Sequence, residues 1–432
     1  MAALALTAVG AVGGLVALAL ASGSPPSDVV VAPTAEDSPS PAPEPEATSR
    51  PTQRPAAPGR RVDLGELTTQ VAAIRGLPVK RRVRSRLLSG PALARKVSAL
   101  AFGEADPDEV EADERLLVAL RLAPRGIDLA ALLEDLYREQ ILGLYVPEER
   151  TLFVKGGRER GSAAQQLTSA HEITHALQDQ SFDLAASQEA VEDDSEASLA
   201  LLSLIEGDAV LTQELWAQRH QTPQQRQDAI AEAQVGGDAL ARAPEYLRAS
   251  LFFPYQEGSR FVAELFTGGG FEAVDRAFAD PPTTSEQILH PEKFRAGEEA
   301  VDVGVQREPG AGWEESATYP LGEFDLHQML LALGSEAART ASEGWGGGEV
   351  RSWTRGADTA VALTVALDTE FDTREVCDAV PRWYVTVADA RETTAGRYRG
   401  DRDHLAIRCE RDRVHVGLAP DPAMAGRLAD LG

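Results

Sequence analysis

The segment 168-TSAHEITHALQDQ-180 places two histidines four positions apart, with a glutamate directly after the first. On a helix, positions i and i+4 share a face, so His171 and His175 could offer imidazole nitrogens to one metal ion. Glu172 lies one step around the helix, where it could act as general base on a water bound to that ion. The spacing predicts a hydrolytic metal site. The alternative is a pair of buried histidines whose hydrogen bonds are satisfied by carboxylates.

A third ligand is needed, because a catalytic zinc ion takes three protein ligands and keeps one position for water. Gln178 and Ser181 stand where the metzincin spacing requires glycine and histidine, which excludes that arrangement. Glu206 interrupts the largely apolar helical run 199-LALLSLIEGDAVLTQELW-216, and a carboxylate there is costly unless it is paired or bound to metal. We therefore predict Glu206 as the third ligand. Gly207 is expected to leave room where two helices crowd together.

Two acids near the predicted ligands could orient a ligating histidine from outside the metal's own ligand set. Asp179 follows His175 by one turn, and Asp208 follows Glu206 by two residues. Each could equally be a solvated acid or a helix-packing contact. The polar run before the apolar helix is predicted to be a loop and helix start, with Asp194 or Ser195 as the N-cap.

Two further side chains could donate a hydrogen bond to the oxyanion of a tetrahedral intermediate. His290 lies in the proline-flanked loop 281-PPTTSEQILHPEKF-294, and Tyr255 lies in 253-FPYQEGSRF-261, between two predicted helices. Loops carry such groups more often than cores do. The alternative for His290 is a hydrogen bond that stabilises its loop, and the alternative for Tyr255 is packing.

The elements before the histidine helix are predicted from turn and cap signals. Two β-rich runs in 141-ILGLYVPEERTLFVKGG-157 flank a turn that Pro147 can start, which indicates a hairpin. Ser162 and Gln165 form a capping-box start for the next helix. The strand 151–155 is expected to be an edge strand that binds extended peptide. An ordinary core hairpin is the alternative.

The remaining pattern predicts an α+β fold that is mostly helical, with a small C-terminal α/β extension. The basic cluster 80-KRRVRSR-86 is interpreted as a solvated helix face, with a lipid-headgroup contact as a lesser alternative. The run 344-GWGGGE-349 lacks the P-loop Lys-Ser/Thr and is interpreted as a flexible turn. Further helices are expected at about 64–76, 91–102, 127–139, 195–218, 224–249 and 256–279, and strands at 360–367, 404–409 and 413–418.

Composition narrows the possible partners and the compartment. The formal net charge of −26 argues against nucleic acid, whose phosphates require a basic surface. Cys377 and Cys409 are the two cysteines, and neither belongs to a CxxC pair, so a cysteine-based zinc or redox site is not expected. Outside the cytoplasm they could form one disulfide, and otherwise they would be two buried thiols.

The N-terminal segments predict export. Residues 1–22 form an uncharged apolar run that could be a signal-anchor helix or a cleaved signal peptide. Residues 23–61 are rich in proline, serine and glutamate, as expected for a disordered tether. The predicted catalytic domain is 62–348 and the extension is 349–432. The chain is therefore expected in the cell membrane, with the domain outside the cytoplasm, or secreted.

Two histidines and a helix-borne glutamate resemble the ligand set of the gluzincin metallopeptidases. More narrowly, 171-HEITHALQDQSFDL-184, 205-IEGDAV-210 and 286-EQILHPEKF-294 resemble a group of uncharacterised bacterial zinc-metallopeptidase-like proteins with an N-terminal membrane or export segment. The resemblance implies a zincin-like domain that binds Zn²⁺ through His171, His175 and Glu206 and hydrolyses peptide or protein substrates. The sequence lacks the NExxSD context of thermolysin. The alternative function is a catalytically weak envelope protein that keeps the scaffold as a binding or structural module.

Overall fold

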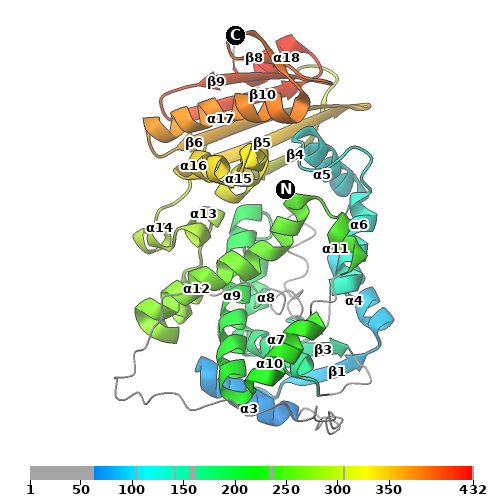
Figure 1. Cartoon of the computed structure of the whole chain (residues 1–432), viewed down its shortest axis with the longest axis vertical. Coiled ribbons are helices and arrows are strands. Elements are labelled where there is room, and N and C mark those ends of the chain that lie inside the picture. Colours follow the sequence, from blue (N-terminus) through cyan, green and yellow to red (C-terminus); the bar gives the residue numbers. More distant parts are fainter. Residues whose placement is uncertain are drawn as a thin grey trace, which may run out of the picture.

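The computed structural model describes residues 63–102, 106–140, 143–155, 161–233, 237–304 and 307–430. Figure 1 shows an elongated molecule in which a helical part, with a small sheet at one end, carries a large sheet at the other end. The apolar run 1–22 and the predicted tether 23–61 lie outside the described residues. No helix among the described residues is both long and apolar enough to cross a bilayer.

The helical part contains the long helices that the apolar periodicity predicts. Helices α7 (Ala163–Phe182), α9 (Ser195–His220) and α12 (Glu245–Ala279) pack together at its centre. The helices around them are α3 (Leu64–Arg75), α4 (Gly90–Phe102), α5 (Pro107–Ala119), α6 (Leu129–Gln140), α8 (Leu184–Glu189), α10 (Pro223–Ala233), α11 (Asp238–Arg242), α13 (Ser285–Leu289) and α14 (Pro291–Ala296).

A three-stranded sheet lies beside α7, with strand order β1 (Arg84–Leu88), β3 (Thr151–Lys155) and β2 (Gly143–Val146). Strands β2 and β3 are antiparallel, which confirms the predicted hairpin. Strand β1 pairs with β3 in parallel. Because β3 is central, the prediction that it is an edge strand is wrong, and the edge nearest α7 is β2.

The large sheet is antiparallel throughout its described strands, in the order β4 (Glu314–Pro320), β5 (Trp345–Arg355), β6 (Asp358–Leu367), β10 (Arg413–Ala419), β9 (His404–Cys409), β8 (Arg397–Arg399) and β7 (Arg391–Thr394). Helices α15 (Glu323–Leu330) and α16 (Ser335–Ser342) precede β5. Alternate residues of β6 face opposite ways: Val361 joins the core with α17 (Glu370–Ala388), whereas Ala362 packs with α18 (Pro422–Leu428).

Two segments differ from their predicted structure. The basic cluster 80–86 is exposed except for Val83, as predicted, but it leads into strand β1 and is not a helix. The glycine-rich run 344–349 belongs mainly to β5 and is not a flexible turn. Its glycines serve close backbone approach: a Cβ on Gly347 would lie 2.2 Å from the Val301 carbonyl oxygen, and one on Gly348 would lie 2.4 Å from that of Leu321.

The helix boundaries around Tyr255 also differ from prediction. The expected helices 224–249 and 256–279 become α10, α11 and a long α12 that begins at Glu245. Tyr255 therefore lies within α12, directly after Pro254, and not in a loop. Backbone dihedrals at Gly269 and Gly270 break α12 near its end.

The two parts share one core, because buried residues of α9, α12, β5 and β6 belong to a single hydrophobic cluster. The large sheet begins at Glu314, and we call the part from Glu314 onward the C-terminal unit; its first strands lie within the range 62–348 that was predicted for the catalytic domain. Cys377 of α17 and Cys409 of β9 form a disulfide, the first of the two predicted alternatives. The fold is thus mixed α+β and mainly helical.

Candidate metal centre

Capping residues at its N-terminus begin helix α7, which carries the segment from His171 to His175. The Ser162 side chain accepts a hydrogen bond from the Gln165 backbone N–H, which confirms the predicted N-cap. The Gln165 side chain bonds the N–H of Gly161, one residue before the cap. The helix continues to Phe182, so both histidines lie within its regular part.

Helix α9 presents Glu206 from the facing side. Asp194 is its N-cap and accepts from the N–H groups of Glu196 and Ala197, as predicted. Gly207 and Gly258 lie where α9 crosses α12. A Cβ on Gly207 would lie 2.1 Å from the Gly258 carbonyl oxygen, so no larger residue fits. The close crossing brings the α12 face that carries Tyr255 up to Glu206.

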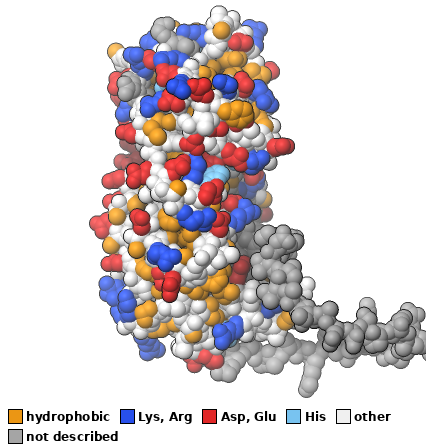
Figure 2. All heavy atoms as spheres, turned by 90° about the vertical axis from the view of Figure 1, so that its left-hand side faces the viewer, with side chains coloured by type: hydrophobic (Ala, Val, Ile, Leu, Met, Phe, Trp, Pro, Cys, Tyr) orange, Lys and Arg blue, Asp and Glu red, His pale blue; other side chains and the backbone are white. Residues whose placement is uncertain are grey.

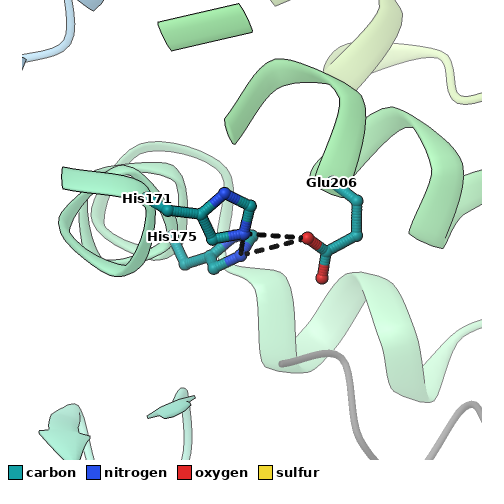
Figure 3. Close-up of side chains that lie close together, drawn as sticks. All are labelled: His171, His175 and Glu206. Carbon is teal, nitrogen blue, oxygen red and sulfur yellow. Dashed lines mark hydrogen bonds and ion pairs between the residues drawn. The ribbon is translucent and has the colours of Figure 1, made fainter. Parts of the chain in front are cut away.

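Three donor atoms converge between the helices (Figure 3). His171 Nε2 lies 3.0 Å from His175 Nε2 and 3.0 Å from Glu206 Oε2, and His175 Nε2 lies 3.5 Å from the same oxygen. Ligands about 2.0–2.1 Å from a tetrahedral zinc ion are about 3.3–3.4 Å apart, so this triangle has the size of one tetrahedral face. All three side chains are at most 2% exposed.

The hydrogen bond made by the far nitrogen of His175 fixes which nitrogen faces the triangle. His175 Nδ1 lies 2.9 Å from Gln178 Oε1. The Gln178 amide nitrogen donates to the Ile205 carbonyl oxygen and to Asp208 Oδ2, which identifies Oε1 as the amide oxygen. His175 must then donate from Nδ1, so in the neutral imidazole the lone pair of Nε2 points to the triangle.

A chain of hydrogen bonds leads from Gln178 through Asp208 to Arg75 on helix α3. Arg75 Nε donates to Asp208 Oδ1 at 2.6 Å, and both side chains are fully buried. Arg75 Nη2 also bonds Asp275 Oδ1 at 2.7 Å. Asp208 therefore orients His175 indirectly, through Gln178, and also joins helices. Asp179 accepts from the hydroxyl of Tyr145.

Glu172 is fully buried beside the triangle. Its Oε2 accepts a hydrogen bond from the backbone N–H of Tyr145 on β2, at 2.8 Å. Its Oε1 is buried without a hydrogen-bond partner, as is Oε1 of Glu206. Burial raises the pKa of Glu172 to about 8, against the charge of His175 and together with that of Glu206. A nearby metal cation would lower that pKa.

Burial and mutual charge shift the pKa values of all three side chains of the triangle. Burial opposes the charged form of His175, yet the Glu206 carboxylate raises the histidine's pKa to about 9. Burial also opposes ionisation of Glu206, and the two histidines nevertheless lower its pKa to about 2. Burial lowers the pKa of His171. The site thus favours one added positive charge between the carboxylate and the imidazoles, which is what a metal ion supplies.

Tyr255 lies at this centre. Its ring centroid is 6.4 Å from that of His171, and the side chain is 4% exposed. Burial raises its pKa well above 10, and the negative charges of Glu206 and Glu172 add to the effect. The tyrosine is therefore neutral and remains a proton donor in hydrogen bonds.

His290 lies elsewhere, at the junction with the C-terminal unit. Its Nε2 is 3.1 Å from a Glu323 oxygen, and its Nδ1 is 3.7 Å from Glu292. The neighbouring α13 is held by Ser285, which donates to Glu196 at the start of α9. Glu196 and Glu206 are ten residues apart, or roughly 15 Å along the helix. These contacts are those of the loop-stabilising alternative.

Sequence reasoning missed Gln178, Tyr145 and Arg75, together with Gln213, which lies against the His171 ring outside hydrogen-bonding geometry. Gln178 is three residues after His175, on an adjacent helical position, so its spacing was a usable signal. Gln213 follows Glu206 by two turns, on the same face of α9. Tyr145 and Arg75 come from distant segments, and no local pattern indicates their roles.

Comparison with known proteins assigns a family model to part of the chain. Residues 307–429 match the domain of unknown function DUF8575, and this range contains the large sheet together with α15 to α18. No curated protein and no solved structure matches the chain. The candidate metal centre therefore lies outside the matched region.

Proposed function

We propose that the protein is a zinc-dependent peptide hydrolase with a zincin-like catalytic domain. The observation that carries the proposal is the triangle of His171, His175 and Glu206, sized for a tetrahedral ion. No lysine or arginine contacts these donor atoms among the described residues. Buried oxygens of Glu172 and Glu206 without partners also fit a site completed by a cation and a water.

A zinc ion held there would supply Lewis acidity and lower the pKa of a coordinated water towards about 7. Glu172 would accept a proton from the attacking water at Oε1, while the Tyr145 N–H holds Oε2 in place. The same carboxyl would then deliver the proton to the leaving amine. Tyr255 is the better placed of the two predicted oxyanion donors, because it contacts the ligand set.

Because β3 is central, we assign to the edge strand β2 the peptide-binding role that the sequence predicts for β3. The Tyr145 N–H points away from β3, since Glu172 accepts it, and residues of an antiparallel strand alternate in this respect. Gly143 therefore presents its backbone outward too. A Cβ there would lie 3.1 Å from Glu172 Cγ. This side of β2 is buried and the Tyr145 N–H is bound by Glu172, so pairing with an extended peptide would require the edge to open; the peptide would then lie beside the proposed general base.

The disulfide between Cys377 and Cys409 supports a location outside the cytoplasm, where such bonds persist. It agrees with the export segment predicted at residues 1–22. The alternative, a scaffold without activity, gives no role to the partner-free oxygen of Glu172, because a structural zinc ion needs no general base.

The test is a single isosteric variant. Glu172→Gln should retain one zinc per chain and its melting temperature, and should lose about 10²–10⁴-fold in turnover of a peptide library. Metal analysis and unfolding provide the controls. Turnover equal to wild type would remove Glu172 from the mechanism, and a wild-type chain that binds zinc without cleaving any peptide would favour the scaffold alternative.

A further inference from the structure

The basic segment Val79–Leu87 differs in charge from the rest of the molecule. Five of the seven residues from Lys80 to Arg86 are positively charged, in a chain whose formal net charge is −26. No acidic residue occurs between Gly76 and Leu88. The face shown in Figure 2, by contrast, has acidic and basic side chains interspersed along its length.

The cations of this segment are displayed to solvent. Every residue from Lys80 to Arg86 is exposed except Val83, which anchors the segment in the core. Arg84 donates to backbone carbonyl oxygens, and Arg81 is 3.9 Å from Asp179. Lys80, Arg82 and Arg86 contact no acidic side chain among the described residues. The charge is therefore available to an external partner.

Apolar side chains border the charges. Val79 is 46% exposed and Leu87 is 57% exposed, and they account for two of the five large apolar side chains that are exposed in the described parts of the chain. Strand β1, which carries Leu87, is an outer strand of the small sheet. Cations flanked by exposed apolar groups suit an interface that is anionic at its surface and apolar beneath, as a lipid leaflet is.

The position of the segment agrees with that partner. Helix α3, where the described chain begins, lies with β1 at the end of the molecule opposite the large sheet (Figure 1). The predicted tether therefore enters the folded part at the end that carries the basic segment. The acidic remainder of the chain would be repelled by an anionic surface, which would turn this end towards it.

We propose that the basic segment Val79–Leu87 is a docking surface for anionic phospholipid headgroups, which holds this end of the molecule against the membrane. Basic residues beside an anionic leaflet favour binding by about fivefold each. The triple variant Lys80→Gln, Arg82→Gln, Arg86→Gln should then lower the ratio of docked to undocked molecules by about a hundredfold. The proposal does not depend on the hydrolase activity.

The experiment uses the full chain in vesicles, so that any anchoring by residues 1–22 is common to all samples. A fluorophore on Ser85→Cys reports energy transfer to labelled lipids, and the natural cysteines are protected because they form a disulfide. Vesicles contain phosphatidylcholine alone or mixed with phosphatidylglycerol. We expect strong transfer with the anionic mixture that is lost at high salt and in the triple variant.

A matched control removes the same charge from elsewhere. Arg125, Arg391 and Arg399 are exposed and distant from the basic segment in the sequence, and their replacement by glutamine should leave the transfer unchanged. Equal transfer on both kinds of vesicle, or an equal loss in both triple variants, would overturn the proposal. Binding of soluble polyglutamate without transfer on anionic vesicles would also overturn it, in favour of an acidic peptide as the occupant.

Discussion

Two groups of three ligand-type side chains lie in the described structure, and they differ in what balances their charge. In the metal centre, two imidazoles and the Glu206 carboxylate converge without a lysine or arginine in contact. In the second group, Glu286, Glu298 and Asp368 surround Lys293, whose ammonium lies 2.6–2.7 Å from all three. Proximity of acids alone therefore does not identify a metal site.

The two groups differ in the source of the cation, which is a lysine of the protein in one group and would be a bound metal ion in the other. Lys293 joins α14 to the carboxylates of α13 and of the segment after β6, and so supplies a cation to the group from within the protein. Burial opposes its charge, but the three acids raise its pKa above the ordinary value. The candidate metal centre instead has two converging imidazole nitrogens, and carboxylate oxygens of Glu172 and Glu206 that have no hydrogen-bond partner. It is incomplete as a hydrogen-bond network, whereas the lysine group is complete.

The largest expected effect is on bound metal. His171→Ala and Glu206→Gln should each weaken zinc binding by more than the roughly 10–100-fold that a lost outer partner costs, because each removes a direct ligand. Glu286→Gln is the matched control from the lysine group and should leave zinc content unchanged. Metal analysis after dialysis is the measurement. Full zinc retention in Glu206→Gln would remove Glu206 from the ligand set, and Asp208 could not simply replace it, because Arg75 and Gln178 already bind its carboxylate.

The second prediction concerns the buried arginine behind the metal centre. Arg75→Met leaves Asp208 buried without its ion-pair partner, and breaking such a pair costs about 3–5 kcal/mol of unfolding free energy. Because Asp208 also holds Gln178, zinc affinity should fall by about 10–100-fold.

Denaturant unfolding and zinc competition measure the two effects of Arg75→Met separately. Asp275→Asn is the control, because Asp275 is 42% exposed and its loss leaves the inner pair of Arg75 and Asp208 intact. A destabilised Arg75→Met variant with undiminished zinc affinity would show that the arginine joins helices without positioning His175.

The ion pair of Arg75 and Asp208 shows which part of the site the sequence could not predict. The proposed ligands and the proposed general base follow from helical periodicity and from one acid in an apolar run, which are local signals. Arg75 meets Asp208 across 133 positions, and its role depends on how α3 packs. The same limit explains β1: its arginines have little strand preference, and its pairing with β3 comes from residues 67 positions later. Long-range pairing overrides local propensity in both cases.

The third prediction concerns the group around Lys293. Lys293→Met should lower the free energy of unfolding by about 2 kcal/mol, because Glu286 is buried and loses its main partner. The partial exposure of Glu298 and Asp368 moderates the loss, since solvent screens their repulsion. Zinc content should be unaffected. Chemical denaturation gives the value, and a change below the error of that measurement would contradict the proposed role of Lys293.

The smallest effect is expected at His290, which joins α14 to Glu323 at the same junction. The hydrogen bond with Glu323 raises the pKa of His290 above 6.5, against the effect of burial. A raised folded-state pKa means that the stabilisation is fully present below about pH 6.5 and is lost as pH rises through the folded value. His290→Ala should therefore cost about 1 kcal/mol near pH 6 and much less near pH 9. His327→Ala is the control, because burial lowers the pKa of His327 and predicts the opposite slope.

Unfolding titrations across this pH range test the sign of the slope for His290→Ala, and steady-state kinetics on the same variant test the predicted oxyanion role. Unchanged kcat with the expected slope would assign His290 to the junction, whereas a loss of about 10²–10³-fold in kcat with unaltered stability would assign it to catalysis.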